Sequence, residues 1–130
     1  MTKHVLLCDD EIFILRAAEF KLKNAGYSVQ IVADSQEAWE AVQARKPDIL
    51  VTDCQMPRMN GLELVEQLRK NPDTRELPVL MLTAKGYELS HERLAEKFNV
   101  IAVIAKPFSP RELLRSIDEI LAGEAVGSRQ

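Results

Sequence analysis

Residues 4–26, HVLLCDDEIFILRAAEFKLKNAG, contain the pattern that decides the fold. A short apolar run at 4–8 is followed by acidic residues, and segment 13–26 then places apolar side chains at helical spacing. The segment stops at Gly26, and glycine is common where a helix ends. The stretch therefore predicts a short apolar strand followed by an amphipathic helix.

The acidic residues between these two elements are Asp9, Asp10 and Glu11. Adjacent carboxylates repel one another and cost stability unless a cation, hydrogen bonds or bulk water offset the repulsion. A cation site at the end of the first strand is one explanation for the three acids. A solvated acidic turn is the other.

The same alternation of strand and helix continues along the chain. Five such units predict one α/β domain, a flavodoxin-like doubly wound (βα)5 fold with a five-stranded parallel sheet. The expected strand order is 2-1-3-4-5, with the ligand site at the carboxyl ends of the first and third strands. The further strands are expected at 28–32, 48–53, 77–83 and 100–105, and the further helices at 34–45, 62–70, 86–98 and 109–122.

The composition excludes several classes of function. A net charge of −3 gives no support to nucleic-acid binding, because proteins that bind the phosphate backbone usually carry a basic patch. The apolar run at 4–8 is too short for a secretory signal or a membrane span. Cys8 and Cys54 are the only cysteines. We therefore expect a cytoplasmic protein with reduced thiols, no nucleic-acid partner and no membrane insertion.

Polar residues end four of the five expected strands. Asp9 and Asp10 follow the first strand, Asp53 ends the third, Thr83 ends the fourth and Lys106 follows the fifth. The carboxyl ends of parallel strands meet at one edge of the sheet, so these side chains are expected to converge there. Three carboxylates, one hydroxyl and one ammonium would then form a single site.

This set of groups is suited to phosphoryl transfer. Oxygen ligands favour a hard cation, which points to Mg²⁺ with Mn²⁺ as a substitute. Lys106 and the metal would neutralise a bound phosphoryl group, and Thr83 would donate a hydrogen bond to it. Aspartate is an established phosphoryl acceptor. Asp53 is the expected acceptor because its strand is central in the sheet.

Four motifs occur in the expected order on the expected elements: CDDE at 8–11, DILVTDCQMPRMNG at 48–61, LMLTA at 80–84 and IAKPF at 104–108. Together they resemble the receiver domain of two-component response regulators. The resemblance covers residues 4–122 and leaves 123–130 as a short flexible tail. The type it suggests is a stand-alone receiver similar to the chemotaxis regulators.

The resemblance implies that Asp53 is phosphorylated from a phosphohistidine, and that Thr83 and Lys106 bind the phosphoryl group and act in the switch. It also implies a cis peptide between Lys106 and Pro107, which is inexpensive because an X–Pro bond prefers trans by only about 0.5–1 kcal/mol. The implied Mg²⁺ ligands are the carboxylates of Asp9, Asp10 and Asp53 and the backbone carbonyl of Gln55.

Two features depart from the family pattern, and one of them is the apolar pair Ile101 and Ala102, where receivers more often have polar residues. Receivers usually carry Tyr or Phe three residues before the motif lysine, as the switch that reports phosphorylation, and this chain has Val103 there. The usual coupling between Thr83 and an aromatic side chain is therefore expected to be altered.

The resulting expectation is a phosphorylation-dependent signalling module, not an enzyme in the ordinary sense. Its expected partners are a sensor histidine kinase or a histidine phosphotransfer protein, and an unidentified downstream protein. Only 123–130 follow the last expected helix, which leaves no room for a DNA-binding output domain. Output is therefore expected through protein–protein contacts.

Two other functions stay open at this point. The chain could be a phosphorelay shuttle or phosphate sink without its own output, which Val103 makes more plausible. It could also be a metal-dependent hydrolase acting through an aspartyl-phosphate. Such hydrolases usually need a second Asp two residues after the nucleophile, and Gln55 stands at that position.

Overall fold

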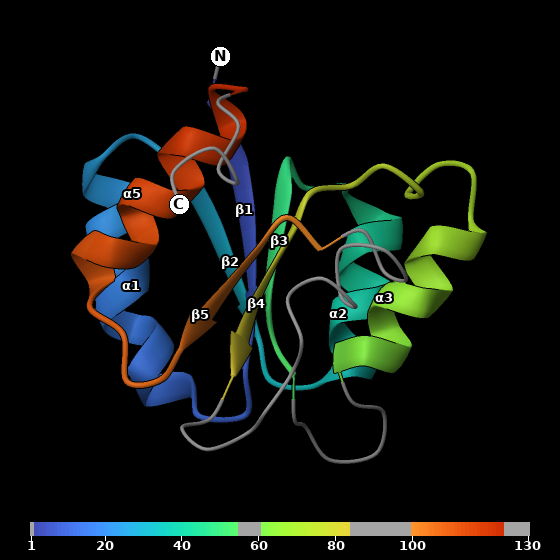
Figure 1. The fold of residues 1–130 in the computed structure, drawn as a ribbon, viewed down its shortest axis with the longest axis horizontal. Coiled ribbons are helices and arrows are strands. Elements are labelled where there is room, and N and C mark those ends of the chain that lie inside the picture. Colours follow the sequence, from blue (N-terminus) through green and yellow to red (C-terminus); the bar gives the residue numbers. More distant parts are fainter. Residues whose placement is uncertain (1, 55–60, 84–99, 124–130) are drawn as a thin grey trace.

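A computed structural model describes residues 2–54, 61–83 and 100–123 (Figure 1). The chain alternates between strands and helices throughout these ranges, as the sequence predicts. The expected helix at 86–98 lies outside the described residues. The strands are β1 (His4–Cys8), β2 (Ser28–Val32), β3 (Ile49–Asp53), β4 (Val79–Thr83) and β5 (Ala102–Ala105), and the helices are α1 (Ile12–Asn24), α2 (Ser35–Ala44), α3 (Gly61–Lys70) and α5 (Pro110–Leu121).

The five strands form one parallel sheet in the order β2-β1-β3-β4-β5. This order confirms the predicted flavodoxin-like topology. The chain runs outward from β1 to β2 and then returns to the other side of β1 for β3, so β1 and β3 flank the point where the winding direction reverses. Ligands of doubly wound proteins bind at this switch point, beyond the carboxyl ends of the strands.

Helices cover both faces of the sheet (Figure 1). Helices α1 and α5 lie against one face, and α2 and α3 lie against the other. Alternate side chains of a strand point to opposite faces, so the core has two halves. On the α1 and α5 side, Leu7 and Val51 pack with Leu15 and Leu113. The other half contains Leu6, Leu50, Val42, Leu64 and Leu68.

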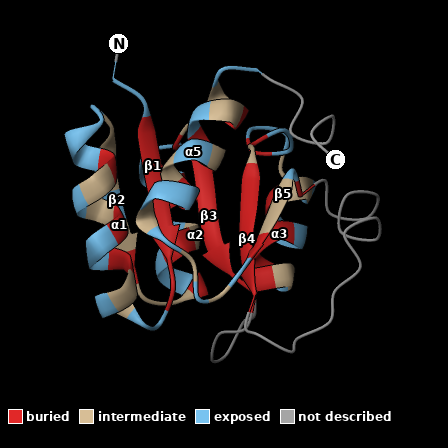
Figure 2. Ribbon diagram, turned by 60° about the vertical axis from the view of Figure 1, so that its left-hand side comes forward, coloured by how far each residue is buried: buried red, intermediate tan, exposed pale blue. Residues whose placement is uncertain are grey.

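The central strands are fully buried. Every residue of β1, β3 and β4 is buried (Figure 2). This accounts for their continuously apolar sequences, because a parallel strand covered on both faces has no solvent-facing side. Burial of these strands makes the sheet a rigid base for the side chains that follow their carboxyl ends.

Two helices begin with side-chain caps. The Asp34 carboxylate accepts a hydrogen bond from the Glu37 backbone N–H at 2.8 Å, before α2. The Ser109 hydroxyl accepts one from the Glu112 N–H at 3.0 Å, before α5. These bonds satisfy backbone donors that the first helical turn leaves without partners.

Among the described residues, no helix combines the length and the apolar character that a membrane crossing requires.

Several element boundaries differ by a few residues from the predicted ones. Asp48 lies outside β3, and its carboxylate accepts a hydrogen bond from the His4 backbone N–H at 2.6 Å. Helix α1 ends at Asn24, two residues before the predicted end, and Gly26 follows at φ +101°. A left-handed conformation is readily available to glycine, and it turns the chain toward β2.

Candidate functional site

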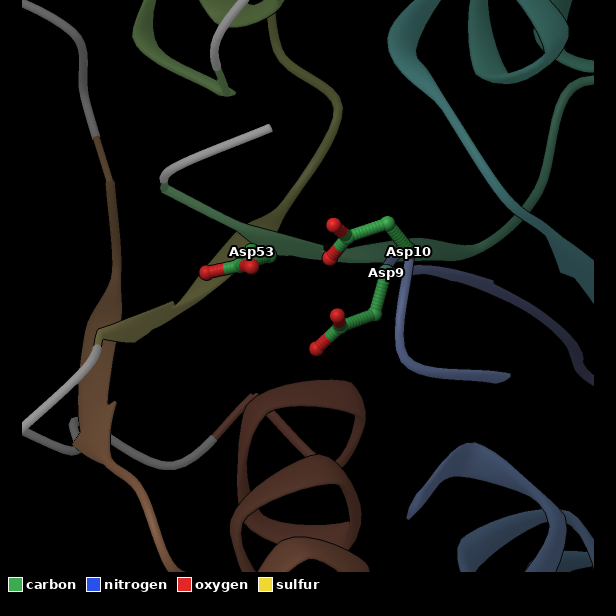
Figure 3. Close-up of side chains that lie close together, drawn as sticks. All are labelled: Asp9, Asp10 and Asp53. Carbon is green, nitrogen blue, oxygen red and sulfur yellow. The ribbon is translucent and has the colours of Figure 1, made fainter. Parts of the chain in front are cut away.

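Three aspartates meet at the carboxyl edge of the sheet. Asp9 and Asp10 follow β1, and Asp53 is the last residue of β3. Each of the three offers a carboxylate oxygen, and these oxygens lie within 4.8 Å of one another. Figure 3 shows the three side chains close together, with Asp9 and Asp10 on the chain that follows β1 and Asp53 at the end of β3.

The register of the sheet accounts for this convergence. Cys8 of β1 pairs with Thr52 of β3, so Asp9 and Asp53, the next residues, are brought side by side. The Asp9 backbone N–H donates to the Val32 carbonyl at 3.2 Å, which extends the ladder to β2 by one residue. Asp9 and Asp53 are buried, whereas Asp10 is exposed.

Lys106 lies against the acidic cluster. Its ammonium nitrogen is 2.6 Å from Asp9 Oδ2, 3.3 Å from Asp53 Oδ2 and 3.1 Å from Glu11 Oε1. The Lys106 side chain is 12% exposed, so these contacts form in a partly desolvated space. The positive charge of the ammonium thereby offsets part of the repulsion among these adjacent carboxylates.

The backbone next to β4 positions Lys106. Its N–H donates to the Thr83 carbonyl at 2.7 Å, directly after β5 ends at Ala105. The peptide bond between Lys106 and Pro107 is cis. Thr83 is the last residue of β4, is buried, and pairs with Ala105. Thr83 and Lys106 therefore lie at the same edge of the sheet as the three aspartates.

Burial dominates the electrostatics of Asp9. Desolvation raises its pKa to about 6, although the Lys106 ammonium and the hydrogen bond from the Glu11 N–H, at 2.9 Å, act in the opposite direction. The neighbouring Asp53 charge adds to the rise. Burial alone would lower the pKa of Lys106, but its contacts with Asp9, Glu11 and Asp53 outweigh burial and raise it. Lys106 therefore stays charged across the physiological range.

The buried Oδ2 atom of Asp9 lies 2.6 Å from the Lys106 ammonium. A buried carboxylate is costly without a positive charge beside it, and Lys106 supplies that charge here. With three carboxylates as donors, the site fits a hard metal ion such as Mg²⁺.

Val103 is half-buried and lies in β5, where it pairs with Met81 of β4. Its side chain packs against the half of the core that α2 and α3 cover. Gln55, the remaining residue of the predicted site, lies outside the described residues.

Two further residues, Gly61 and Glu11, lie at the site without a predicted role there. Gly61 donates its backbone N–H to the Cys54 carbonyl at 2.9 Å, and a Cβ atom on Gly61 would lie 2.2 Å from the Asp53 carbonyl oxygen. No other residue type fits so close to that backbone. The second residue is Glu11, through its contact with Lys106. The only sequence signal for either was its place inside a motif.

The thiols of Cys8 and Cys54 are buried beside the site and form no disulfide. Burial raises the pKa of Cys8 to about 12, so it is protonated at neutral pH. Reactivity requires the thiolate, and Cys8 is therefore expected to be inert in the folded protein.

A doubly wound parallel sheet, with acids and a lysine gathered at its switch point, defines a class of α/β protein with a ligand site at the strand ends. The chain belongs to the response regulator receiver domain family, whose model matches residues 5–118. This finding confirms the resemblance seen in the motifs.

Individual relatives agree with this assignment. The chain is 36% identical over 121 residues to the alkaline phosphatase synthesis transcriptional regulatory protein PhoP of Bacillus subtilis, a match covering 93% of this chain and 49% of that protein. It therefore spans about half the length of this curated relative. A putative response regulator from Chloroflexus aurantiacus has a similar structure, with a TM-score of 0.84 and 34% identity over 94% of this chain and 99% of that one.

A third similar structure is the receiver domain of the sensor histidine kinase PA1611 from Pseudomonas aeruginosa. It has a TM-score of 0.79 and 26% identity over 94% of this chain and 99% of that one. That structure holds a magnesium ion coordinated in its active-site cleft.

Proposed function

We propose that this chain is a phosphorylation-dependent signalling module of a two-component system, in which Asp53 accepts a phosphoryl group from a phosphohistidine. The observation that carries the proposal is the arrangement around Asp53. Its carboxylate lies 3.3 Å from the Lys106 ammonium and within 4.8 Å of the carboxylates of Asp9 and Asp10, at the switch point of a receiver fold.

The proposed cofactor is Mg²⁺, with Mn²⁺ as a substitute. The residues that would hold it are Asp9, Asp10 and Asp53, together with the backbone carbonyl of Gln55. Support comes from the all-oxygen donor set and from the closeness of the three carboxylates, whose oxygens lie within 4.8 Å of one another. The magnesium-bound receiver domain of PA1611 is consistent with this choice. When bound, the ion supplies positive charge beside the transferred oxygens.

The proposed transfer uses one carboxylate oxygen of Asp53 as the nucleophile. A lone pair of this oxygen forms the new O–P bond, the N–P bond of the phosphohistidine breaks, and its electron pair returns to the imidazole ring. The product is an acyl phosphate on Asp53. Little covalent chemistry is asked of the other residues, which position the group and neutralise its charge.

Lys106 and Thr83 are the proposed ligands of the phosphoryl oxygens. Lys106 already contacts Asp53 through its ammonium, and Thr83 lies on the neighbouring strand. Binding of both side chains to the phosphoryl group would favour one of two pre-existing conformations, and the change would reach the surface that partners recognise.

Val103 favours a second candidate function. It packs into the core at the position where receivers usually carry an aromatic switch residue. Without that aromatic side chain, the chain could pass phosphoryl groups along a phosphorelay, or act as a sink, with no output of its own. Rapid back-transfer to a phosphotransfer protein, without any gain in affinity for another partner, would favour this candidate.

The proposed partners are a sensor histidine kinase or a histidine phosphotransfer protein, and a downstream protein that recognises the phosphorylated form. No nucleic-acid contact and no membrane insertion are proposed. The proposed location is the cytoplasm. The only reactions proposed for the chain are its own phosphorylation and a slow loss of the phosphate, so it is not proposed to turn over external substrates.

Intact-protein mass spectrometry tests this proposal. Wild type and Asp53→Asn are incubated with acetyl phosphate, each with and without Mg²⁺. The expected result is the gain of one phosphoryl group by wild type only, and only with Mg²⁺. A phosphoryl group on Asp53→Asn, or an equal gain after removal of Mg²⁺, would contradict the assignment of Asp53 or of the metal.

A further inference from the structure

Glu11 makes a contact that its position in the sequence does not explain. It is the residue that precedes the first turn of α1, yet its side chain accepts no hydrogen bond from the helix. The carboxylate instead reaches Lys106, 95 residues away in the sequence, at 3.1 Å. Glutamate is not a preferred capping residue, so the helix start gains little from this side chain.

The Lys106 ammonium already contacts three carboxylates in this structure. It donates hydrogen bonds to Glu11 and Asp53 and lies 2.6 Å from Asp9 Oδ2. An ammonium has three N–H donors and no acceptor, one donor for each of these carboxylates. A phosphoryl oxygen can therefore gain the full contact with Lys106 only when one of the present carboxylates gives up its place.

Burial shows which of the three carboxylates leaves at the lowest cost. Asp9 has no exposed side-chain surface and would be left as a buried charge without its cation. Asp53 is 6% exposed and would itself carry the phosphoryl group. The Glu11 side chain is 47% exposed, so water can solvate its carboxylate as soon as Lys106 departs.

We propose that Glu11 is an exchangeable counter-ion of Lys106: it holds the ammonium in the unphosphorylated protein and is displaced when a phosphoryl group arrives on Asp53. Glu11 then acts as a positioning residue that stabilises the unphosphorylated state. Part of the binding free energy between Lys106 and the phosphoryl group is used to displace Glu11, and only the rest favours the switched conformation. This inference rests on the proposed function, because it assumes that Lys106 binds the phosphoryl group.

The test uses the phosphoryl mimic trifluoroberyllate, titrated calorimetrically into the protein at saturating Mg²⁺. Two variants separate the ion pair from the general effect of charge. Glu11→Gln removes the negative charge, whereas Glu11→Asp keeps it on a side chain one methylene shorter. Aspartate is also a preferred helix cap, which gives the shortened side chain another hydrogen-bond partner.

Glu11→Asp is expected to bind trifluoroberyllate about twofold to fivefold more tightly than wild type, the effect of one partly exposed ion pair. Its affinity for Mg²⁺ alone should equal that of wild type. Glu11→Gln should also bind trifluoroberyllate more tightly, but it should bind Mg²⁺ no better than wild type, since it has lost a nearby negative charge. A merely structural role for Glu11 would weaken both ligands together.

A second pair of variants shows whether the effect passes through Lys106. In a Lys106→Ala background, Glu11→Asp should leave trifluoroberyllate affinity unchanged, because the contact is already absent. Glu19→Gln is the matched charge control, since Glu19 lies on the same helix and pairs with Arg16 and Lys23. It should behave as wild type toward both ligands.

The outcomes distinguish this inference from the proposed function. If wild type binds trifluoroberyllate and Glu11→Asp binds it equally or less tightly, the exchange role of Glu11 is wrong and the proposed function stands. An equal gain from Glu11→Asp in the Lys106→Ala background would also overturn it. If wild type binds Mg²⁺ but no trifluoroberyllate, the proposed function fails, and the role of Glu11 fails with it.

Discussion

The Lys106 ammonium lies 2.6 Å from the Oδ2 atom of Asp9, a side chain with no exposed surface. This ion pair joins the residue after β1 to the residue after β5, across the carboxyl edge of the sheet. The carboxylate is thus held in a dry space beside two further acids, where its charge is costly. The consequences of that cost can be measured.

The first prediction concerns the pH dependence of stability without metal. The pKa of Asp9 is about 6 in the folded protein, above its value in the unfolded chain. The unfolded state therefore releases this proton at lower pH, so the contribution of protonated Asp9 to stability is present in full below the unfolded pKa of 3.8 and is lost as pH rises from there through 6. We expect a loss on the order of 2 kcal/mol between pH 4 and pH 7.

Urea unfolding at several pH values in EDTA measures this effect. Asp9→Asn is the control, because it has no titrating group at this position and shares the other groups of wild type. The free energy of unfolding of wild type, relative to that of Asp9→Asn, should fall as pH rises from 4 to 7. A difference that stays constant from pH 4 to pH 7 would show that Asp9 titrates normally.

The second prediction concerns Mg²⁺ binding. Protonated Asp9 cannot serve as a ligand, so protons compete with the metal below about pH 6. The apparent affinity for Mg²⁺ should fall as pH drops through 6, and Mg²⁺ should stabilise the protein more at pH 7.5 than at pH 5. Calorimetric titration across this range measures the affinity. The same affinity at pH 5 and pH 7.5 would argue against Asp9 as a ligand.

The third prediction concerns Lys106→Ala. The substitution leaves buried Asp9 without its cation, and removal of one partner of a buried ion pair costs about 3 kcal/mol. The cost should be smaller at pH 5, where Asp9 is protonated. Mg²⁺ affinity should be retained or improved, since a competing cation is gone. Partner binding should no longer respond to phosphorylation.

Thermal unfolding and Mg²⁺ titration of Lys106→Ala check these effects, with Lys23→Ala as a control that removes an exposed ion pair of α1. A collapse of Mg²⁺ affinity in Lys106→Ala alone would show that Lys106 supports the metal site and does not act on the phosphoryl side.

The fourth prediction concerns Gly61→Ala. The new Cβ would meet the Asp53 carbonyl oxygen at 2.2 Å, so the backbone at the phosphoacceptor must shift. We expect a loss of stability of about 1–3 kcal/mol, as for other overpacked sites, and slower phosphorylation by acetyl phosphate.

Gly26→Ala is the matched control for Gly61→Ala. It is strained by its φ of +101° but has no atom near the added Cβ, and it lies between α1 and β2. It should lose stability without loss of phosphorylation rate. An unchanged rate in Gly61→Ala would show that Asp53 tolerates the shift.

The fifth prediction concerns Asp53→Asn. Asp53 lies within a cluster of acids, and the substitution removes one negative charge while keeping a hydrogen-bonding side chain of similar size. The metal-free variant should therefore fold, with a melting temperature within a few degrees of that of wild type or slightly higher. It should accept no phosphoryl group. A large drop in melting temperature would mean that Asp53 has a structural role that the proposed site does not include.

The sequence by itself determined the alternation of elements, the parallel sheet and the list of polar residues at its edge. Apolar periodicity and helix caps are local, so 109–122 could be predicted as a helix from Ser109, Pro110 and the spacing that follows. The strand order followed from the number of βα units, and the convergence of Asp9, Asp53 and Lys106 followed from that order.

Only the tertiary structure decided how these groups act on one another. The contact of Glu11 with Lys106 depends on packing across 95 residues of chain, and the fit of Gly61 against Asp53 depends on backbone positions within a fraction of an ångström. The raised pKa of Asp9 comes from complete burial. Distance and desolvation are set by the folded arrangement as a whole, and no local pattern in a sequence encodes them.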